Sequence, residues 1–434
     1  MESTQHSPLR LDIHEKPALL PGLILSFQHV FAMFGATVLV PLILDMSVST
    51  ALAASGIGTL IYILATKAQV PVYLGSSFAY ISAMAIAKEA MGGRIDAAQS
   101  GIMLVGIIYV LVALVVKATG SAWIHRLLPP IVIGPMIMVI GLGLAGTAVS
   151  SAGLVADADW RNIVVALSTF AVAIGITVRG KGFIRVIPFL IAIVFGYLVA
   201  LILGIVDLSP VAQAAWFSFP DLSLPFKTGF SNIASYQFNF GPATWAILPL
   251  AIVTISEHIG DHVVLGEITH QDFILKPGLH RTLIGDGVAT FVSAFIGGPA
   301  NTTYGENTGV IGMTKVASVS VIRNAAIIAI ALSFLGKFTA LISTIPDAVL
   351  GGMAILLYGV IASNGLKVLI KARTNFNHSR NLIIASAMLV IGLGGAVLPL
   401  GSALTLSGTA LSALVGVILN LVLPHEDKDN VEDF

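Results

Sequence analysis

The chain has 434 residues, of which 56% are hydrophobic and only 10% are charged, and it contains no cysteine. A soluble domain carries about 25% charged residues, so this composition leaves too little polar surface to cover a globule of this size. The 22 Lys and Arg residues balance the 22 Asp and Glu residues, which leaves no basic footprint for nucleic acid. The absence of cysteine excludes disulfides, thiolate nucleophiles, iron–sulfur clusters and Cys-ligated zinc. The composition therefore predicts a polytopic helical membrane protein.

Apolar stretches of about 20 residues, the length that spans a bilayer, follow one another along the chain. Residues 1–18 before them are polar and lack the apolar core of a signal peptide, so they predict a cytoplasmic tail. The longest connection, 207–240, is rich in Pro, Ser and Phe and is expected at the membrane interface. The expected spans are 19–44, 48–66, 71–90, 100–119, 128–149, 161–178, 182–206, 241–262, 280–298, 299–317, 318–337, 340–363, 380–397 and 404–424.

Basic residues are unequally divided between the two sides of these fourteen expected spans. Because fourteen is even, both termini lie on one side, including a second tail at 425–434. If that side is the inside, seventeen of the 22 Lys and Arg residues lie inside, as the positive-inside rule requires of the cytoplasmic side. The sequence therefore predicts a multi-pass protein of the cell membrane with both termini in the cytoplasm.

Two spans, 71–90 and 299–317, open with proline and contain glycine and polar residues before their apolar runs. Non-helical backbone at membrane depth is tolerated only where protein buries it or where it lines a wet cavity. A matched pair of such spans points to a transporter site. They are the third and tenth spans, which correspond if the chain consists of two repeats of seven. Because seven is odd, the second repeat must be inverted, so we expect an all-α integral membrane fold of two inverted seven-span repeats.

Most acidic residues lie in loops or tails, but four lie inside expected spans: Glu257, Asp261, Asp286 and Glu306. Ionisable side chains in spans are costly and mark functional sites by default. Glu257 and Glu306 have no Lys or Arg close in sequence, so we assign both to the site. Asp261 lies one turn after Glu257 on the same face and is interpreted as a proton-coupling or gating group. Gly260 beside it is expected to let another backbone approach closely.

Other ionisable residues in the spans have a structural alternative. His29, in the middle of the first span, either takes part in function or makes a helix–helix hydrogen bond. His258 and His262 have the i, i+4 spacing of a metal or haem pair, but no third ligand is evident in the sequence. We therefore expect no metal and no cofactor beyond a coupling proton. Asp286 is flanked by glycines near the start of a span, which favours a cap or a packing bond over a site.

The ligand chemistry follows from two kinds of partner. Exposed N–H groups at a half-helix N-terminus donate hydrogen bonds, and carboxylates accept them, so the ligand must offer both C=O acceptors and N–H donors. Phe78, Tyr80 and Tyr304 supply aromatic faces nearby. A planar ring of the nucleobase type meets these demands, whereas a simple anion is repelled by two carboxylates unless they are protonated. No nucleophile–base pair or cofactor motif supports an enzyme.

At these residues the chain resembles the nucleobase–ascorbate (nucleobase–cation symporter 2) family, and within it the bacterial uracil-permease branch, over essentially its whole length. The resemblance implies a core domain of 19–119 and 241–337 and a gate domain of 128–206 and 340–424. It also implies short antiparallel strands that meet at mid-membrane in the third and tenth spans. The matching segments are Gln28-His29-Val30-Phe31-Ala32-Met33-Phe34-Gly35-Ala36-Thr37, Tyr73-Leu74-Gly75-Ser76-Ser77-Phe78-Ala79, Glu257-His258-Ile259-Gly260, and Asn301-Thr302-Thr303-Tyr304-Gly305-Glu306-Asn307-Thr308-Gly309 with Thr314-Lys315.

For the site, the resemblance implies that Glu257 binds the N–H and C=O edge of a pyrimidine ring. Glu306 would be the second carboxylate, and its position at the start of Glu-Asn-Thr-Gly is similar to that in the uracil branch. The backbone N–H groups of Phe78 and Gly305 would donate to the ring carbonyls. Tyr304 and Phe78 would form the aromatic walls of the site.

The implied function is proton-coupled uptake of uracil across the cell inner membrane by alternating access, with Asp261, His29 and Glu306 as proton-coupling or gating residues. One departure is that close uracil permeases carry His where this chain has Asp261, an acid that resembles the purine and ascorbate branches. The alternatives are a symporter of xanthine or another purine base, and an anion exchanger or channel of the same fold. The expected partners are the nucleobase and the lipid bilayer, and a homodimer is compatible with the sequence.

Overall fold

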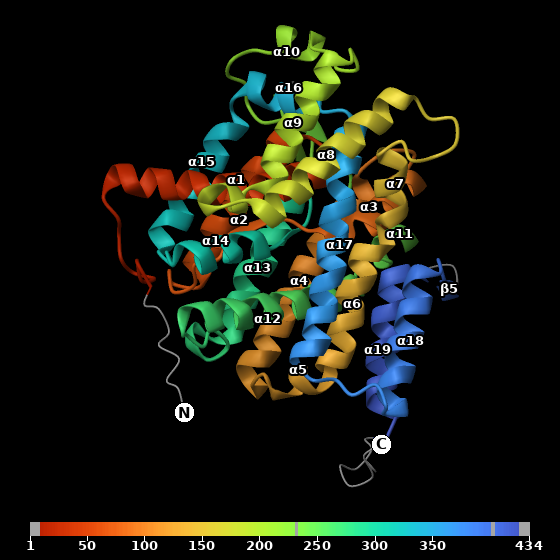
Figure 1. Cartoon of the computed structure of the whole chain (residues 1–434). Coiled ribbons are helices and arrows are strands. Elements are labelled where there is room, and N and C mark those ends of the chain that lie inside the picture. The colour runs from red at the N-terminus through yellow and green to blue at the C-terminus, as the bar shows by residue number, and fades with distance from the viewer. Residues whose placement is uncertain (1–8, 231–232, 401–403, 425–434) are drawn as a thin grey trace.

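A computed structural model gives the structure of residues 9–230, 233–400 and 404–424. Within these ranges the chain is mostly helical, and helices from distant parts of the sequence lie side by side (Figure 1). The expected C-terminal tail 425–434, and residues 1–8 of the expected N-terminal tail, lie outside the described residues.

The helices of the first half alternate with short connections and with one extended segment. They are α1 (Leu19–Ile43), α2 (Val48–Ala65), η1 (Phe78–Tyr80), α3 (Ile81–Ala90), α4 (Asp96–Thr119), α5 (Ala122–Leu127), α6 (Pro130–Gly143), α7 (Ala145–Ser151), α8 (Trp160–Arg179), η2 (Gly182–Val186) and α9 (Pro188–Ile202).

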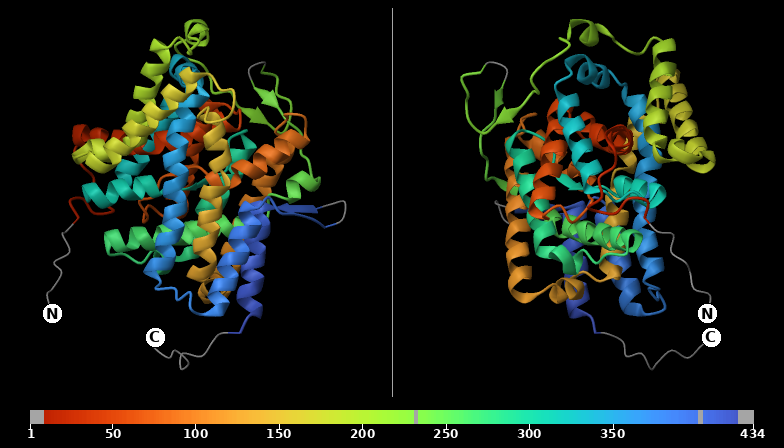
Figure 2. Two further views of the ribbon diagram at one scale, coloured as in Figure 1. Left: turned by 45° about the vertical axis from the view of Figure 1, so that its right-hand side comes forward. Right: turned by 90° about the vertical axis from the view of Figure 1, so that its left-hand side faces the viewer.

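The helices of the second half follow the long connection 207–240. They are α10 (Ser209–Gln213) within that connection, then α11 (Pro242–Trp245), α12 (Leu250–Thr269), η3 (Ile274–Gly278), α13 (Leu279–Phe295), α14 (Gly305–Thr314), α15 (Val319–Ser333), α16 (Gly336–Ser343), α17 (Asp347–Lys371), α18 (Ser379–Leu393) and α19 (Gly408–Val422). The connection also contains β2 (Ser223–Leu224) and β3 (Ala234–Ser235), which Figure 2 shows on the outside of the helices.

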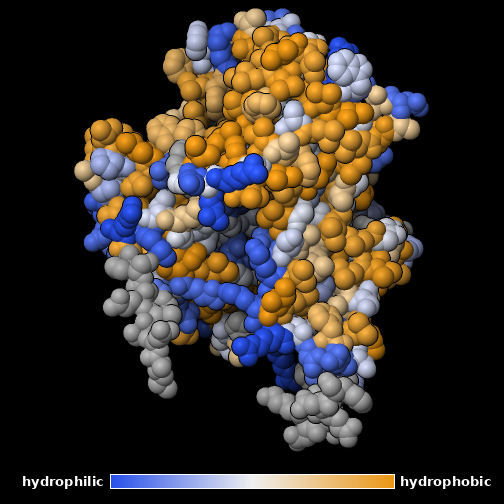
Figure 3. Space-filling model, viewed as in Figure 1, coloured by the Kyte–Doolittle hydropathy of each residue, from blue (hydrophilic) through white to orange (hydrophobic). Residues whose placement is uncertain are grey.

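In the described part of the chain, seven helices are long and apolar enough to cross a membrane. The number rises to eight if α15 and α16, which meet at an angle of 83°, form one broken span. Three shorter apolar helices, α9, α18 and α19, accompany them. Hydrophobic side chains cover much of the surface (Figure 3), as is required of a protein in contact with lipid. The chain is therefore a multi-pass membrane protein.

Two expected spans have different boundaries in the structure. The expected span 340–363 is displaced, because residues 336–343 form α16 and the long helix α17 begins only at Asp347. Pro346 separates the two, and a proline disfavours helical backbone in the residue before it. The expected span 404–424 begins as a strand, since β6 (Leu404–Ser407) pairs antiparallel with β5 (Val397–Leu400). Helix α19 starts only after this hairpin, at Gly408.

The described part of the expected N-terminal tail is hydrogen-bonded to the helical part of the protein. Arg10 N donates to Lys315 O at 2.7 Å, Ala317 N donates to Leu11 O at 2.9 Å, and Val319 N donates to Ile13 O at 3.0 Å. These bonds run along the short segment between α14 and α15. The tail therefore supplies the backbone partners that this segment does not find in a helix.

The two broken spans pair with one another. Strand β1 (Leu74–Ser76) lies antiparallel to β4 (Asn301–Thr303), with Leu74 opposite Thr303 and Ser76 opposite Asn301. Each strand is followed directly by a helix, η1 and α3 after β1 and α14 after β4. The expectation of short antiparallel strands in these spans is thus confirmed, and one helix begins at each end of the ladder.

Side chains of two neighbouring helices complete the hydrogen bonding of this small ladder. From α2, Ser55 Oγ donates to Leu74 O at 2.7 Å, and Thr59 Oγ1 accepts from Leu74 N at 2.9 Å. From α13, Thr290 Oγ1 donates to Asn301 O at 3.1 Å. A two-stranded ladder leaves its outer N–H and C=O groups unpaired, and lipid offers no partner for them. The hydroxyl groups of α2 and α13 therefore stabilise the extended backbone inside the helical fold.

The helices form two packing groups. In the first, α13 packs against α2 and α4, and α15 packs against α1 and α2, around the paired strands. In the second, α17 packs against α6, α8 and α9, and α18 packs against α6 and α19. Both broken spans belong to the first group, and α1 and α12 lie where it meets the second.

Close helix crossings depend on glycine. At the crossing of α4 and α13, a Cβ at Gly106 would lie 2.6 Å from the carbonyl oxygen of Gly287, and a Cβ at Gly287 would lie 2.8 Å from that of Gly106. Two glycines facing each other allow the helix backbones to touch, which is how membrane helices associate without a hydrophobic driving force between them.

We expect Gly106→Val to destabilise the fold by about 1–3 kcal/mol or more, because the added side chain would collide with backbone that cannot move aside. Gly175→Val in α8 is the matched control, since a Cβ there would meet nothing within 4 Å. The midpoint of thermal unfolding in detergent, followed by gel filtration of heated samples, should fall for Gly106→Val only. Equal midpoints for the two variants would contradict this account of the crossing.

Candidate functional site

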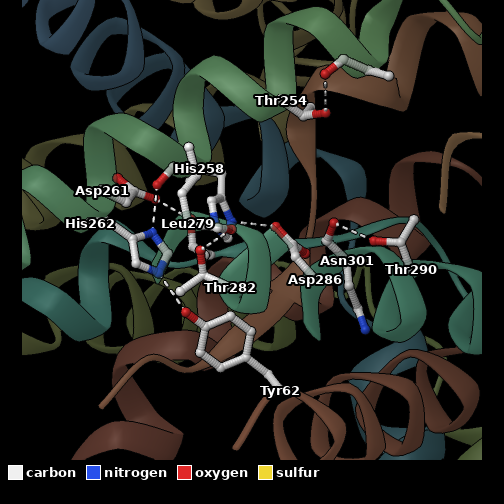
Figure 4. A network of polar contacts seen from close by, with 12 residues as sticks. Tyr62, Thr254, His258, Asp261, His262, Leu279, Thr282, Asp286, Thr290 and Asn301 are labelled. Atoms are coloured by element: carbon white, nitrogen blue, oxygen red, sulfur yellow. Dashed lines mark hydrogen bonds and ion pairs between the residues drawn. The ribbon is translucent and has the colours of Figure 1, made fainter. Parts of the chain in front are cut away.

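Helix α12 carries ionisable side chains on two neighbouring faces. Glu257 and Asp261 are one turn apart and half-buried. His258 and His262 are buried on the next face, with exposed fractions of 0% and 1%. Figure 4 shows both histidines and Asp261 along the same helix. The helix therefore presents one carboxylate face and one histidine face, as the i, i+4 spacing predicts.

The carboxylate face of α12 meets the second broken span. Thr303, at the end of β4, donates a hydrogen bond of 2.5 Å from its Oγ1 to Asp261 Oδ2. Glu306 lies in the first turn of α14, within electrostatic range of both Glu257 and Asp261. Asp286 of α13 is within the same range of both, so the structure brings all four acids that the sequence singled out into one region. Asp286 pairs with His258, whereas none of the ion pairs in the described part of the chain involves Glu257, Asp261 or Glu306.

Open space lies beside these carboxylates. A Cβ built on Gly260 or on Gly309 would meet no atom within 4 Å, and at Gly305 the nearest atom would be Asp261 Oδ1 at 4.0 Å. The expectation that Gly260 lets another backbone approach is therefore wrong. Because the packing around α12 is open on this side, its glycine borders unfilled space instead of a neighbouring helix.

Helix starts lie at both ends of the paired strands, next to α12. The first N–H groups of a helix have no partner within the helix, and here two helices begin directly after the paired strands, at Phe78 and at Gly305. These are the two residues whose N–H groups the family resemblance assigns to the site. Free N–H groups at helix starts favour negative or partly negative ligand atoms such as a carbonyl oxygen.

Phe78 also faces the second packing group. Its ring meets the ring of Tyr358, from α17, edge to face with centroids 6.1 Å apart. The Tyr358 side chain is 2% exposed, and its hydroxyl group has no hydrogen-bond partner among the described residues. A buried hydroxyl without a partner is costly. Tyr358 is therefore a candidate for ligand contact, contributed by the second packing group.

Tyr304 is held tightly against β1. Its hydroxyl donates to Ser76 O at 3.0 Å and accepts from Thr37 Oγ1 at 3.1 Å, and the residue is 3% exposed. A Cβ at Gly75 would lie 2.4 Å from the Tyr304 ring, so this position of β1 must be glycine. These contacts join α1, β1 and the start of α14, which fixes where the α14 helix begins.

His29 connects the first helix to the same turn of α14. Asn307 Nδ2 donates to His29 Nδ1 at 3.1 Å and to the His29 backbone oxygen at 3.1 Å. His29 is 1% exposed. Because Nδ1 accepts, the proton of the neutral ring sits on Nε2. This geometry favours the helix–helix alternative for His29, which holds the residue next to Glu306 in place.

The histidine face of α12 forms a buried polar network (Figure 4). The Tyr62 hydroxyl lies 2.5 Å from His262 Nε2, and His262 Nδ1 lies 2.6 Å from the backbone oxygen of His258. His258 Nδ1 lies 2.8 Å from Asp286 Oδ2 of α13. Asp286 therefore makes the packing bond that the sequence favoured. No group of three or more His, Cys, Asp or Glu residues in the described ranges could hold a metal ion.

Sequence reasoning missed several residues of this region. Thr303 donates a hydrogen bond to Asp261 and Asn307 donates one to His29. The Tyr358 hydroxyl has no partner among the described residues. Thr303 and Asn307 lie within the polar segment of the tenth span, so the break in its apolar pattern is the sequence feature that indicates them. Tyr358 lies in an ordinary apolar helix, and nothing in its local sequence marks it.

The comparisons with known proteins give the family. The family model described as "Permease family" matches residues 22–401. A uracil permease of Bacillus caldolyticus is 52% identical over 95% of this chain and 94% of its own length. Uracil permeases of Bacillus subtilis and Escherichia coli K12 are 48% and 42% identical, over 98% and 95% of this chain and 97% and 93% of their own lengths.

Solved structures of low sequence identity share the fold. The transmembrane domain of a cyanobacterium bicarbonate transporter, BicA, is similar with a TM-score of 0.65 at 15% identity, covering 94% of this chain and 99% of that one. The murine anion transporter Slc26a9 in the inward-facing state is similar with a TM-score of 0.69 at 12% identity, covering 94% of this chain and 69% of that one.

The family model covers most of the chain, and the curated relatives match it over nearly their full lengths. These relatives are permeases, which are transporters and not enzymes. The chain belongs to the nucleobase–ascorbate transporter family of permeases.

Proposed function

We propose that this permease takes up uracil together with a proton across the cell inner membrane. The observation that carries the proposal is the meeting of two helix starts, at Phe78 and Gly305, with the carboxylates of Glu257 and Glu306. Donors from the two helix starts and acceptors from the two carboxylates match the C=O and N–H groups of a pyrimidine ring. The naming of relatives at 42–52% identity as uracil permeases supports this substrate.

Within the site, Glu257 accepts from the ring N–H groups and Glu306 is the second carboxylate. The N–H groups of Phe78 and Gly305 donate to the ring carbonyls. The Phe78 ring, and the Tyr358 ring that packs against it, cover the faces of the pyrimidine. Tyr304 acts through its contacts with β1 and so holds the start of α14, which departs from the aromatic wall that the resemblance implies.

Transport proceeds by alternating access between two domains. The core comprises 19–119 and 241–337, and the gate comprises 128–206 and 340–424, within two inverted repeats of seven spans. The two packing groups of helices support this division, because the site residues of the core and Tyr358 of the gate lie on opposite sides of their boundary. Both termini lie in the cytoplasm, on the side that carries most of the basic residues.

The coupling proton binds to a carboxyl group in the cluster of Glu257, Asp261 and Glu306. Three ionised carboxylates near one another, with no cation paired to them, repel strongly in a low-dielectric site. One proton relieves this repulsion and leaves an acceptor for the ligand. Proton and uracil together then shift the population between outward-facing and inward-facing states. Asp261 is our candidate for the protonated group, and His29 positions Glu306 through Asn307.

The alternatives differ in the ligand. Asp261 resembles the acid of the purine and ascorbate branches, so xanthine is the second candidate substrate. An anion exchanger is the third, because the similar structures include a bicarbonate transporter and an anion transporter. Competition of unlabelled uracil, xanthine and bicarbonate against labelled uracil uptake in proteoliposomes separates the three. Saturable uptake of labelled uracil that neither xanthine nor bicarbonate inhibits supports the proposal. Absence of saturable uracil uptake, beside uptake of labelled bicarbonate or xanthine by the same proteoliposomes, overturns it.

We expect Glu257→Gln to weaken uracil binding roughly 10- to 100-fold, because a charge-assisted hydrogen bond is worth about 1.5–3 kcal/mol. Glu267→Gln is the matched control on the same helix, since Glu267 is exposed and pairs with Lys371. Equilibrium binding of labelled uracil to purified protein measures both. Near wild-type affinity in Glu257→Gln would remove this residue from the site.

Gly305→Val should abolish uracil binding while the protein stays folded. A Cβ at this position has room, with Asp261 Oδ1 at 4.0 Å as its nearest atom, but the side chain would occupy the space next to the backbone donor. Gly175→Val serves as the control for the added bulk. A Gly305→Val protein that unfolds no earlier and still transports uracil normally would show that the break in the tenth span is only structural.

Asp261→Asn should flatten the stimulation of uptake by acid and leave uracil binding within roughly tenfold, about 1.4 kcal/mol. The amide can still accept from Thr303 Oγ1 but cannot bind the coupling proton. Thr303→Val is the companion variant, because it removes the hydrogen-bond donor and keeps the carboxyl group. Initial uptake rates across pH would keep their acid stimulation in Thr303→Val. If the pH dependence of uptake is unchanged in Asp261→Asn, the coupling proton must instead be assigned to Glu257, Glu306 or His29.

A further inference from the structure

A second polar region lies away from the carboxylate cluster. It is a hollow of about 540 Å³ between α1, the end of α14 and the η2 segment. We call it the basic hollow; its lining residues include Arg10, Gln28, Lys181, Arg185 and Thr314. Helices α1 and α14 belong to the first packing group and η2 adjoins the second, so the hollow lies on the boundary between the two groups.

The charge of the basic hollow is of one sign. Arg10, Lys181 and Arg185 line it, and no Asp or Glu residue does. None of the three forms an ion pair with a described residue. All three are exposed and lie on the side expected to carry most of the basic residues, but the hollow gathers them around one space with no carboxylate in its lining. The arrangement favours an anionic ligand that all three can contact.

The surroundings of the basic hollow are those of a membrane surface. Exposed apolar side chains flank it along the sequence on both sides: on α1, Leu20 is 69% and Ile24 is 56% exposed, and near η2, Val178 is 75% and Ile184 is 52% exposed. Figure 3 shows hydrophilic side chains gathered where α8 ends above α14, with hydrophobic surface around them. A basic site bordered by apolar side chains matches a phospholipid better than a soluble ion, because the acyl chains gain contacts as well.

Gln28 adds a hydrogen-bonding requirement. Its side-chain Oε1 is buried and has no hydrogen-bond partner among the described residues, and the residue lines the basic hollow. A buried acceptor without a donor is costly. A ligand that carries a hydroxyl group next to its phosphate would satisfy it.

We propose that the basic hollow binds the headgroup of an anionic phospholipid with free hydroxyl groups, of the phosphatidylglycerol type. Arg10 and Arg185 hold the phosphate oxygens through their guanidinium groups, Lys181 adds a third positive charge, and Gln28 accepts from a headgroup hydroxyl. The lipid would bridge α1 and η2 across the boundary of the two packing groups. Its effect on transport rests on the proposed function, whereas its binding does not.

Native mass spectrometry of the full chain, purified free of lipid and titrated with phosphatidylglycerol, tests the binding. We expect the triple variant R10Q/K181Q/R185Q to bind at least about tenfold less lipid than the wild type. The matched control K117Q/R323Q/K367Q removes the same charge from exposed positions outside the basic hollow and should bind like the wild type. Equal adducts in the two triple variants would overturn the proposal.

Two further arms identify the source of the phosphate. Phosphatidylcholine, titrated in the same way, should form no site-dependent adduct, because its headgroup is neutral overall and lacks a free hydroxyl. Inorganic phosphate should not compete at concentrations far above those of the lipid. If phosphate alone binds, and its binding is lost in R10Q/K181Q/R185Q, the site belongs to a soluble anion and the lipid proposal is overturned. The variant R10K/R185K keeps the charge, and its retention of lipid would show that a loss in the triple variant reflects charge and not misfolding.

Uracil binding provides the separate readout. Glu257→Gln should lose uracil and keep phosphatidylglycerol, whereas R10Q/K181Q/R185Q should lose phosphatidylglycerol and keep uracil binding in detergent. If the proposed function is wrong, Glu257→Gln keeps its uracil affinity while R10Q/K181Q/R185Q still loses phosphatidylglycerol. If the lipid site is wrong, R10Q/K181Q/R185Q keeps its phosphatidylglycerol adducts while Glu257→Gln still loses uracil.

Discussion

Backbone N–H and C=O groups in the interior of a bilayer have no water to bond, and the pairing of β1 with β4 exists under that constraint. The two extended segments satisfy each other in register. Hydroxyl groups of Ser55, Thr59 and Thr290 form hydrogen bonds with backbone N–H and C=O groups that the two strands leave unpaired. Only because the strands are satisfied in this way can two helices begin in the middle of the fold. The first N–H groups of these helices are then the donors of the proposed site.

The two faces of α12 show how the remaining polar groups are distributed. On one face, His258 and His262 share hydrogen bonds with Tyr62 and Asp286 and are closed off by neighbouring helices, while His258 Nε2 and Asp286 Oδ1 have no partner among the described residues. On the other face, the carboxylates border open space beside Gly260. A buried polar group that is hydrogen-bonded holds its helix in position, and one that borders open space is available to a ligand. The bonds of the histidine network therefore hold α12 where it presents Glu257 and Asp261 to the proposed site.

The boundary between the packing groups combines apolar and polar contacts. A Cβ at Gly35 of α1 would lie 3.2 Å from Phe189 Cβ of α9, and the Phe78 ring meets Tyr358 edge to face. Apolar contacts are not directional, so two bodies can slide against each other at low cost. The polar groups at this boundary include the exposed ion pair of Lys371 and Glu267 as well as those of the proposed site and the basic hollow. A molecule bound at either of the last two can favour one relative position over another.

The sequence by itself determined the membrane class, most helix positions, both broken spans and which acids lie inside spans, because hydropathy, proline, glycine and buried charge are local signals. It placed Glu257 and Asp261 on one face by helical spacing alone. It did not indicate Tyr358, the bond from Thr303 to Asp261, or the open space beside Gly260. Those follow from which distant segments meet, and side-chain pairing across more than forty residues leaves no periodic trace in the chain. The tertiary structure therefore decided which polar groups are satisfied by the protein and which are left for a ligand.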